Sequence, residues 1–442
     1  MSKTTAPETG TLGRVLRNFL HLLGGRSAAG ILAFVATLYS ARVLGSAEFG
    51  TVVLVHAYAS LWRGLVNIKP FEAIVRYGVP LLEEKDRHGL GRLLRVMLLI
   101  DFTSAIAGTG LGMAAAYLAA HIFSWPEGTA RIAVWYCLVL LASGTATANG
   151  ILRIYDRFDA IGRVHITAAI VRLGGVIGVT AFFGATVPMI AGVWAASLGT
   201  QYLTMQWLGW RVIRTQLPRE ALLGPFEFQR VSAEHPSIWR FLNIVYWQSS
   251  LDLVPKQVGT LFAGWLLGTE GAALYRIARE FAKMVSKPAL FVRQAVYPHL
   301  ARLRHRNDGE FNRVLYHLIA IMAVPGTVLT GLSIWQGERL LGLAVGQSYV
   351  AAGVLMSWFI AAAVLDLVGA PLRPAAYTLN RAGAVFRLQC AASVAYIALF
   401  VTLSQELGLI GPGVATLAMQ SLSLAGMTII VRRPTTGLEK AS

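Results

Sequence analysis

The distribution of lysine and arginine along the chain constrains its fold more than any other feature. Twelve apolar segments are each long enough to cross a bilayer, which takes about 20 residues per helix, and the loops between them alternate between basic and nearly uncharged. The N-terminal arm, the even-numbered loops and the C-terminal tail hold most of the cations, whereas the odd-numbered loops hold Arg131 and Arg339. Because short loops rich in lysine and arginine stay cytoplasmic, the sequence predicts a multi-pass bacterial inner-membrane protein with both termini in the cytoplasm.

Composition agrees with a membrane protein. The chain is 55% hydrophobic and 14% charged, which is more apolar surface than a soluble domain of 442 residues can bury. The net charge of +17 is explained by the cytoplasmic loops, so no nucleic-acid partner is expected. Cys137 and Cys390 both lie in apolar spans and have no metal-ligand spacing. The first apolar run continues through Arg42 into a second span, so no cleavable signal peptide is expected.

The apolar segments group into two sets of six, separated by a polar connection with three prolines. The predicted spans are 27–44, 48–67, 96–120, 131–150, 163–184, 187–209, 238–267, 271–298, 313–334, 349–370, 382–404 and 409–431. The predicted organisation is a cytoplasmic amphipathic arm (1–26), an N-terminal six-helix lobe (27–209), a cytoplasmic linker (210–237), a C-terminal six-helix lobe (238–431) and a cytoplasmic tail (432–442). The fold class is therefore an all-α integral membrane protein with twelve transmembrane helices.

The two predicted lobes contain similar short motifs at almost the same offset. Gly45, at the corner after the first span, corresponds to Gly268, 223 residues later, and Arg157 corresponds to Arg381 at an offset of 224. One interpretation is chance similarity of short motifs. The other is an internal duplication. Since six is an even number of spans, a duplication makes both lobes enter the membrane from the same side, as a parallel repeat that encloses a site.

No signature of an enzyme is present in the sequence. There is no phosphate-binding glycine loop with a lysine, no paired-histidine helix and no Cys-x-x-Cys pair. The glycines at 108, 110 and 112 lie in an apolar span and are typical of close helix packing. The nine histidines are scattered, mostly in or near loops. We therefore expect no catalytic residues, no metal and no cofactor.

Charged residues within the apolar spans give the clearest functional signal, because charge inside a bilayer is costly and usually functional. Span eight carries Arg276, Arg279, Lys283 and Lys287 in one stripe about 80° wide, with Glu280 beside it. Span seven carries Asp252 and Lys256 on one face, and span five carries Arg172 at a comparable depth. The predicted substrate-binding cations are Arg172, Lys256, Arg279, Lys283 and Lys287, and the predicted ion-coupling or internally paired acids are Asp101, Asp252 and Glu280.

Two interpretations of these charges are open. In the first they form a closed network of ion pairs, or extend to the lipid headgroups, which suits a pair between Arg63 and Asp101 near the cytoplasmic edge. In the second they line a water-filled cavity that attracts anions. The central position of Lys283 and Lys287, and the excess of cations over anions, favour the cavity.

Several stretches resemble one transporter family. They are Ala41-Arg42-x-Leu44-Gly45 followed by Glu48-Phe49-Gly50, then Gly150 to Arg153 with Arg157-Phe158, then Gly268, Leu274-Tyr275, Ala278 and Val296-Tyr297-Pro298, and finally Leu341 to Tyr349. In their order and spacing the chain resembles the oligosaccharide flippase (polysaccharide transporter) family of the multidrug/oligosaccharidyl-lipid/polysaccharide exporter superfamily. The resemblance covers nearly the whole chain.

The resemblance implies a V-shaped exporter fold and alternating access. The implied activity is translocation of an undecaprenyl-diphosphate-linked oligosaccharide from the cytoplasmic to the periplasmic leaflet, for synthesis of O-antigen, capsule or exopolysaccharide. The implied partners are the lipid-linked oligosaccharide, the membrane, a polysaccharide polymerase and glycosyltransferases. The alternatives are an ion-coupled exporter of drugs or other small molecules, a lipid II flippase, and a membrane polysaccharide polymerase or ligase. Two extra C-terminal helices are typical of lipid II flippases, whereas this chain ends after twelve predicted spans.

Overall fold

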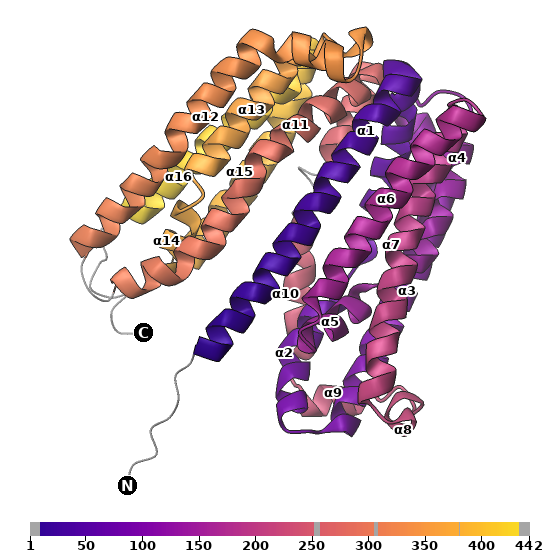
Figure 1. The fold of residues 1–442 in the computed structure, drawn as a ribbon, viewed down its shortest axis with the longest axis vertical. Helices are drawn as coiled ribbons and strands as arrows, with labels where there is room; N and C mark the ends of the chain where they lie inside the picture. Colours follow the sequence, from indigo (N-terminus) through magenta and orange to yellow (C-terminus); the bar gives the residue numbers. More distant parts are fainter. Residues whose placement is uncertain (1–8, 252–256, 305–307, 380, 433–442) are drawn as a thin grey trace. The chain divides into compact units, whose positions relative to one another are not determined.

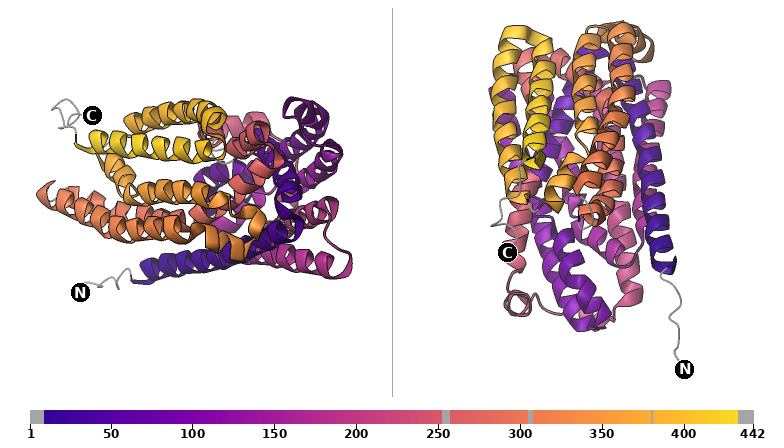
Figure 2. Two further views of the ribbon diagram at one scale, coloured as in Figure 1. Left: turned by 90° about the horizontal axis from the view of Figure 1, so that it is seen from above. Right: turned by 90° about the vertical axis from the view of Figure 1, so that its left-hand side faces the viewer.

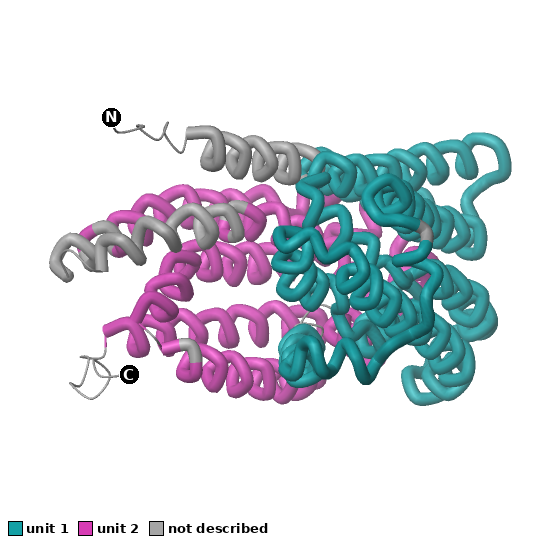
Figure 3. Tube along the Cα trace, turned by 90° about the horizontal axis from the view of Figure 1, so that it is seen from below, with its two compact units in different colours: residues 1–44, 55–253 teal, residues 45–54, 254–442 magenta. Residues whose placement is uncertain are grey.

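The computed structural model describes residues 9–251, 257–304, 308–379 and 381–432, and these are almost wholly helical (Figure 1). The chain divides into two compact units (Figure 3). Unit 1 comprises residues 1–44 and 55–253, and unit 2 comprises residues 45–54 and 254–442. The described residues contain no β-strand, which confirms the predicted all-α class.

The first half of the chain supplies eleven elements within its described residues. They are α1 (Thr9–Val66), α2 (Pro70–Glu83), α3 (Arg87–Ile122), α4 (Thr129–Cys137), the 3-10 helix η1 (Leu138–Ser143), α5 (Ala146–Ile154), α6 (Phe158–Phe182), α7 (Val187–Gln216), α8 (Arg219–Leu222), α9 (Phe228–Glu234) and α10 (Ile238–Leu251). The side chains of residues 1–26 are outside the described set, so the amphipathic placement of the arm stays a prediction.

The second half of the chain supplies eight elements within its described residues. They are α11 (Gly259–Arg304), α12 (Asp308–Ala344), η3 (Gln347–Tyr349), α13 (Ala352–Val368), α14 (Leu372–Thr378), α15 (Ala382–Leu407), η4 (Gly408–Ile410) and α16 (Gly411–Arg432). In unit 2, α13 packs against α11, α12 and α16, and α15 packs against α16. Figure 2 shows these long helices running side by side.

Among the described residues, seven helical stretches are long and apolar enough to cross a membrane. They are Ser27–Val66, Arg87–Ile122, Thr129–Ile154, Phe158–Phe182, His317–Ala344, Ala352–Thr378 and Gly383–Arg432. The first and last each contain two predicted spans, so the seven stretches cover nine of the twelve. The predicted span 271–298 is not among them, and it lies in α11, whose five charged residues between Arg276 and Lys287 lower its hydropathy.

Several helix boundaries differ from the sequence prediction. The first two spans form one kinked helix, α1, and the fourth span is interrupted at Gly144, between η1 and α5. The predicted linker 210–237 is shorter and more ordered than a polar loop, because α7 continues to Gln216 and the short helices α8 and α9 follow. The segment 68–95, predicted as a loop, contains α2, which begins with Pro70 at its first turn.

Two pairs of backbone irregularities support the internal repeat. Gly45 in α1 has φ 74° and ψ 176°, and Gly268 in α11, 223 residues later, has φ 74° and ψ −177°. The fourth long helix of each half is also broken at a glycine, Gly144 in the first and Gly369 in the second. Gly45 and Gly268 therefore share a backbone conformation that residues with a side chain rarely adopt, which chance similarity of short motifs does not explain.

Substitution of Gly45 or Gly268 by alanine is expected to lower stability by about 1–3 kcal/mol each. A Cβ at either glycine meets no atom within 4 Å, so the cost is backbone strain and not a steric clash. Gly110→Ala is the matched control, because a Cβ there also meets nothing within 4 Å and its φ is helical. Thermal unfolding in detergent measures the effect, and equal midpoints for all three variants would contradict it.

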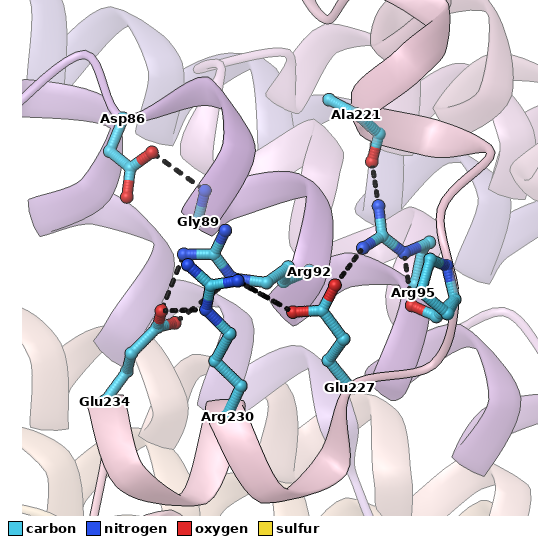
Figure 4. Close-up of polar contacts among 9 residues, drawn as sticks. Asp86, Gly89, Arg92, Arg95, Ala221, Glu227, Arg230 and Glu234 are labelled. Atoms are coloured by element: carbon cyan, nitrogen blue, oxygen red, sulfur yellow. Dashed lines mark hydrogen bonds and ion pairs between the residues drawn. The ribbon is translucent and has the colours of Figure 1, made fainter.

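One end of unit 1 is held together by a polar cluster that fixes the linker (Figure 4). Arg95 of α3 is 8% exposed and donates to the carbonyls of Ala221 and Pro225, the latter at 3.1 Å. Arg92 pairs with Glu234 of α9 at 2.6 Å. Apolar residues of α2, α3, α5, α6 and α7 form a core cluster of unit 1. The linker therefore docks on the end of α3 as an ordered part of unit 1.

Candidate functional site

The cationic stripe predicted in span eight lies on α11, within unit 2. Arg279, Lys283 and Ser286 follow one another at helical spacing, so they share one face of α11. Tyr275 is one turn before Arg279, and the Arg279 guanidinium lies over its ring, 5.8 Å from the centroid. The guanidinium of Arg279 and the ammonium group of Lys283 therefore lie on the same face of α11.

The acidic residue of the stripe is internally paired. Glu280 Oε1 accepts from Arg276 at 2.7 Å and from Lys283 Nζ at 2.8 Å. The side chains of Glu280 and Arg276 are 13% and 12% exposed, whereas that of Lys283 is 42% exposed. One carboxylate thus serves two cations, and the more accessible of the two keeps an open side for a ligand. The ion pairs agree with the first interpretation of the sequence, while the accessibility of Lys283 leaves the second one open.

A cavity of about 330 Å³ lies against this face of α11. Four helices line it. The lining residues are Tyr275, Arg279, Ala282, Lys283 and Ser286 from α11, Phe359, Ala362, Ala363 and Asp366 from α13, Tyr396 from α15, and Thr416, Met419 and Gln420 from α16. The hydroxyl groups of Tyr275 and Tyr396 lie 3.4 Å apart. The cavity therefore combines two cations with hydroxyl, amide and aromatic groups.

A second cavity of about 180 Å³ shares three lining residues with the first, namely Asp366, Met419 and Gln420. Its other polar lining residues are Arg373, Gln389, Ser393 and Ser423, and Arg373 donates to Gln389 at 3.3 Å. Polar groups therefore extend along the inside of unit 2 from α11 to α14 and α15, with Asp366 in between.

Lys287, Asp252 and Lys256 are the remaining predicted residues of the second half. Lys287 lies beyond the cavity and its Nζ contacts Met284 Sδ at 3.3 Å. Asp252 and Lys256 are outside the described residues, so their predicted roles stay predictions.

Arg172, which was predicted to join the same cationic site, lines a cavity within unit 1. Its guanidinium lies 3.4 Å from the centroid of the Trp194 indole, and Trp194 is 1% exposed. His56 and His165 line the same cavity, which measures about 310 Å³. The stack on an indole positions the Arg172 charge toward a polar chamber of its own unit.

Asp101 is 3% exposed and forms a structural contact in unit 1. Its Oδ2 accepts from the backbone N–H of Thr147 at 2.8 Å, at the start of α5. A carboxylate at a helix N-terminus is stabilised by the unpaired N–H groups and the helix dipole. The predicted ion pair between Asp101 and Arg63 is not formed in the described part of the chain, because Arg63 lies over the Tyr202 ring at 4.7 Å instead.

Comparison with known proteins identifies the family. Residues 40–352 match the family model described as polysaccharide biosynthesis protein. The chain belongs to the polysaccharide biosynthesis protein family. The "Inner membrane protein YghQ" of Escherichia coli (strain K12) is 23% identical over 351 residues, which are 78% of this chain and 96% of that protein.

Solved structures show the fold of this family member. A multidrug resistance MATE family transporter of the MOP superfamily, in an inward-facing conformation, has a TM-score of 0.69 at 17% identity, over 93% of this chain and 96% of that one. The lipid II flippase MurJ, in an inward closed conformation, has a TM-score of 0.71 at 13% identity, over 93% and 87%. The chain therefore has the exporter fold that these transporters share, as the sequence resemblance implied.

Sequence reasoning missed several cavity residues of this family member. Asp366 is the only acidic residue between 349 and 370, and that isolation was a usable signal. The sequence analysis singled out neither His56 nor His165 among the scattered histidines, and both lie inside long helices, α1 and α6. Tyr275, Tyr396 and Gln420 gave no signal, since aromatic and amide residues in apolar spans are common packing residues.

Proposed function

We propose that this protein is a transporter that translocates an undecaprenyl-diphosphate-linked oligosaccharide across the bacterial inner membrane. The observation that carries the proposal is the cavity of unit 2, in which Arg279 and the exposed side of Lys283 face hydroxyl, amide and aromatic groups. Membership of the polysaccharide biosynthesis protein family and the name of the E. coli relative support the substrate class and the location.

The physical need for such a cavity follows from the headgroup. A diphosphate loses its hydration when it leaves water, and an unpaired charge in hydrocarbon costs many kcal/mol. Arginine and lysine replace part of that hydration with charge-assisted hydrogen bonds. The lipid tail stays in the bilayer while the headgroup passes through the polar interior.

The uncharged groups of the cavity suit the sugar part of the same substrate. Thr416, Gln420 and Ser286 offer hydroxyl and amide groups, which are hydrogen-bond partners for sugar hydroxyls. Phe359 and Tyr396 offer apolar ring surface beside them. A diphosphate joined to a sugar therefore matches both the cationic groups and the uncharged groups of the lining.

The main alternative is an ion-coupled exporter of small organic molecules, which is consistent with the MATE transporter among the structural neighbours. An exporter of cationic drugs would place carboxylates against its ligand. Here the cavity lining has two cations and Asp366 as its acidic residue. A lipid II flippase and a membrane polysaccharide polymerase or ligase are further alternatives. An anionic substrate fits the lining better than a cationic drug does.

The proposal includes a topology in which both termini are cytoplasmic. Reporter fusions at Gly128, between α3 and α4, and at Gly346, between α12 and η3, are expected to report the periplasm. Fusions at Arg157 and Glu227 are expected to report the cytoplasm. One reversed reporter would contradict the twelve-span arrangement.

Depletion of the protein in its own cell tests the function. We expect lipid-linked oligosaccharide to accumulate on the cytoplasmic side and surface polysaccharide to fall, with no change in resistance to cationic drugs. A plasmid copy of the wild-type gene should restore both. Normal surface polysaccharide together with lost drug resistance would contradict the proposal and favour the drug exporter.

A further inference from the structure

The cavity of unit 1 corresponds to the cavities of unit 2 through the internal repeat. His56 precedes Arg279 by 223 residues, and His165 and Arg172 precede Gln389 and Tyr396 by 224. These are the two offsets that relate the paired motifs. All three unit 1 residues line one cavity, and their counterparts line the two joined cavities of unit 2. Both units therefore carry a polar chamber at equivalent positions, with different chemistry.

The unit 1 chamber is basic. His165, Ala168, Ala169 and Arg172 share one face of α6, and Trp194, Ser197, Leu198 and Gln201 share one face of α7. His56 enters from α1. No residue of this described lining is acidic. Its volume of about 310 Å³ is that of roughly ten water molecules, which leaves room for a phosphate-sized ion.

The contacts of His56 hold its imidazole in place. Its Nδ1 lies 2.8 Å from the Tyr136 hydroxyl, and its ring meets the Trp194 indole edge-on at 5.2 Å. Trp194 also stacks with Arg172, so one indole connects the imidazole with the guanidinium. Within the described lining and contacts, the titratable groups beside the two histidines are Arg172 from α6 and Tyr136 from α4. The described lining residues from α1 and α7 other than His56 are uncharged.

Charge then links protonation to binding. Arg172 is always cationic, so a proton on either histidine adds a second positive charge to a small chamber, which is unfavourable without a counter-ion. An anion beside Arg172 removes that penalty and favours protonation. By reciprocity, protonation raises the affinity for the anion. Histidine is the residue whose ordinary pKa allows this exchange near neutral pH.

We propose that the unit 1 cavity is a binding site for a phosphate-like oxyanion, and that binding there is coupled to proton uptake by His56 and His165. The site differs from the proposed substrate cavity in unit 2, which lacks histidine in its described lining. The unit 1 site therefore makes the anion affinity of the transporter depend on pH. A metal cation does not suit the chamber, because its lining supplies a guanidinium and no carboxylate.

Histidine NMR of the full-length protein in lipid nanodiscs tests the coupling. ¹⁵N-labelled imidazoles are titrated with and without sulfate, which is a divalent oxyanion that does not itself titrate near neutral pH. His56→Gln and His165→Gln identify the two signals. We expect saturating sulfate to move both titration midpoints upward by about one pH unit, which corresponds to roughly tenfold tighter sulfate binding for each proton taken up.

Two variants separate this site from the one in unit 2. Arg172→Gln should abolish the shift. Arg172→Lys keeps the positive charge and should retain part of the shift, and it also shows whether the fold tolerates a substitution at this position. Lys283→Gln should leave the shift intact, although it impairs the proposed export. Failure of the proposed function and failure of this inference are thus distinguishable.

Farnesyl diphosphate, added in place of sulfate, distinguishes the source of the anion. A shift with both ligands indicates a site for free oxyanions, and a shift with farnesyl diphosphate alone indicates a lipid headgroup, each in support of the coupling. No shift with either ligand, or a shift that survives unchanged in both Arg172 variants, overturns it.

Discussion

Replacing Lys283 by glutamate is expected to abolish export of the lipid-linked oligosaccharide. Lys283 lines the unit 2 cavity and is 42% exposed, and it already shares Glu280 with Arg276. A glutamate here faces the diphosphate with a like charge and adds a second carboxylate one turn from Glu280. Lys283→Gln removes only the attraction between the ammonium group and the diphosphate. This loss should lower the binding free energy of the substrate by about 1–3 kcal/mol, or its affinity roughly five- to a hundredfold. Lys283→Arg keeps the charge and should retain much of the activity.

Lys287 provides the matched control for this series. It is the next cation along α11, but it lies outside the cavity lining and contacts Met284. Lys287→Gln should therefore export close to normally. Surface polysaccharide and cytoplasmic lipid-linked oligosaccharide are measured together with the protein level in the membrane. Normal export by the Lys283→Glu variant at normal protein level would refute the cationic site.

Replacing Arg95 by alanine is expected to release the linker from the end of unit 1. Arg95 is 8% exposed, and its guanidinium donates to the carbonyl of Ala221 in α8 and to that of Pro225 between α8 and α9. It also lies 4.0 Å from Glu227. Hydrogen bonds from a charged group are worth about 1.5–3 kcal/mol each. Loss of two of them should shift the local opening equilibrium by roughly a hundredfold or more. Limited proteolysis between residues 217 and 237 measures that opening.

Arg230 is the control for charge without burial. It pairs with Glu227 and with Glu234, both at 3.4 Å, but its side chain is 61% exposed. Exposed ion pairs contribute about 0–1 kcal/mol, so Arg230→Ala should be cleaved nearly as slowly as the wild type. If the two variants were cleaved at the same rate, burial would not be what fixes the linker.

The long-range organisation of this protein could be predicted from sequence because it depends on periodic and additive properties. Hydropathy and loop charge located most of the membrane helices. The motif pair around Gly45 and Gly268 predicted a repeat that appears in the structure as two glycines with the same backbone angles. The resemblance to oligosaccharide flippases agreed with the family and the fold.

Contacts between residues far apart in the sequence could not be predicted from hydropathy, loop charge and motifs. The charge at Asp101 suggested an ion pair with Arg63, but the carboxylate contacts the start of α5, because the break in the fourth helix at Gly144 exposes N–H groups there. Breaks of that kind leave no periodic signal. Arg172 was grouped with the α11 cations by depth, and its stack on Trp194 could not be predicted, because depth does not specify the neighbours of a side chain. The isolated charge of Asp366 in an apolar span was visible in the sequence, but the packing of the unit 2 helices determines which other residues share its cavity.

Translocation by the purified protein in lipid vesicles tests the central claim most directly. The substrate is a short oligosaccharide on a polyprenyl diphosphate, compared with the same oligosaccharide on an uncharged polyprenyl lipid, and a probe added outside measures its arrival in the outer leaflet. We predict translocation of the diphosphate-linked form alone, with loss in the Lys283→Glu variant and retention in the Lys287→Gln variant. Equal translocation of the charged and uncharged lipids, unaffected by Lys283→Glu, would contradict the account.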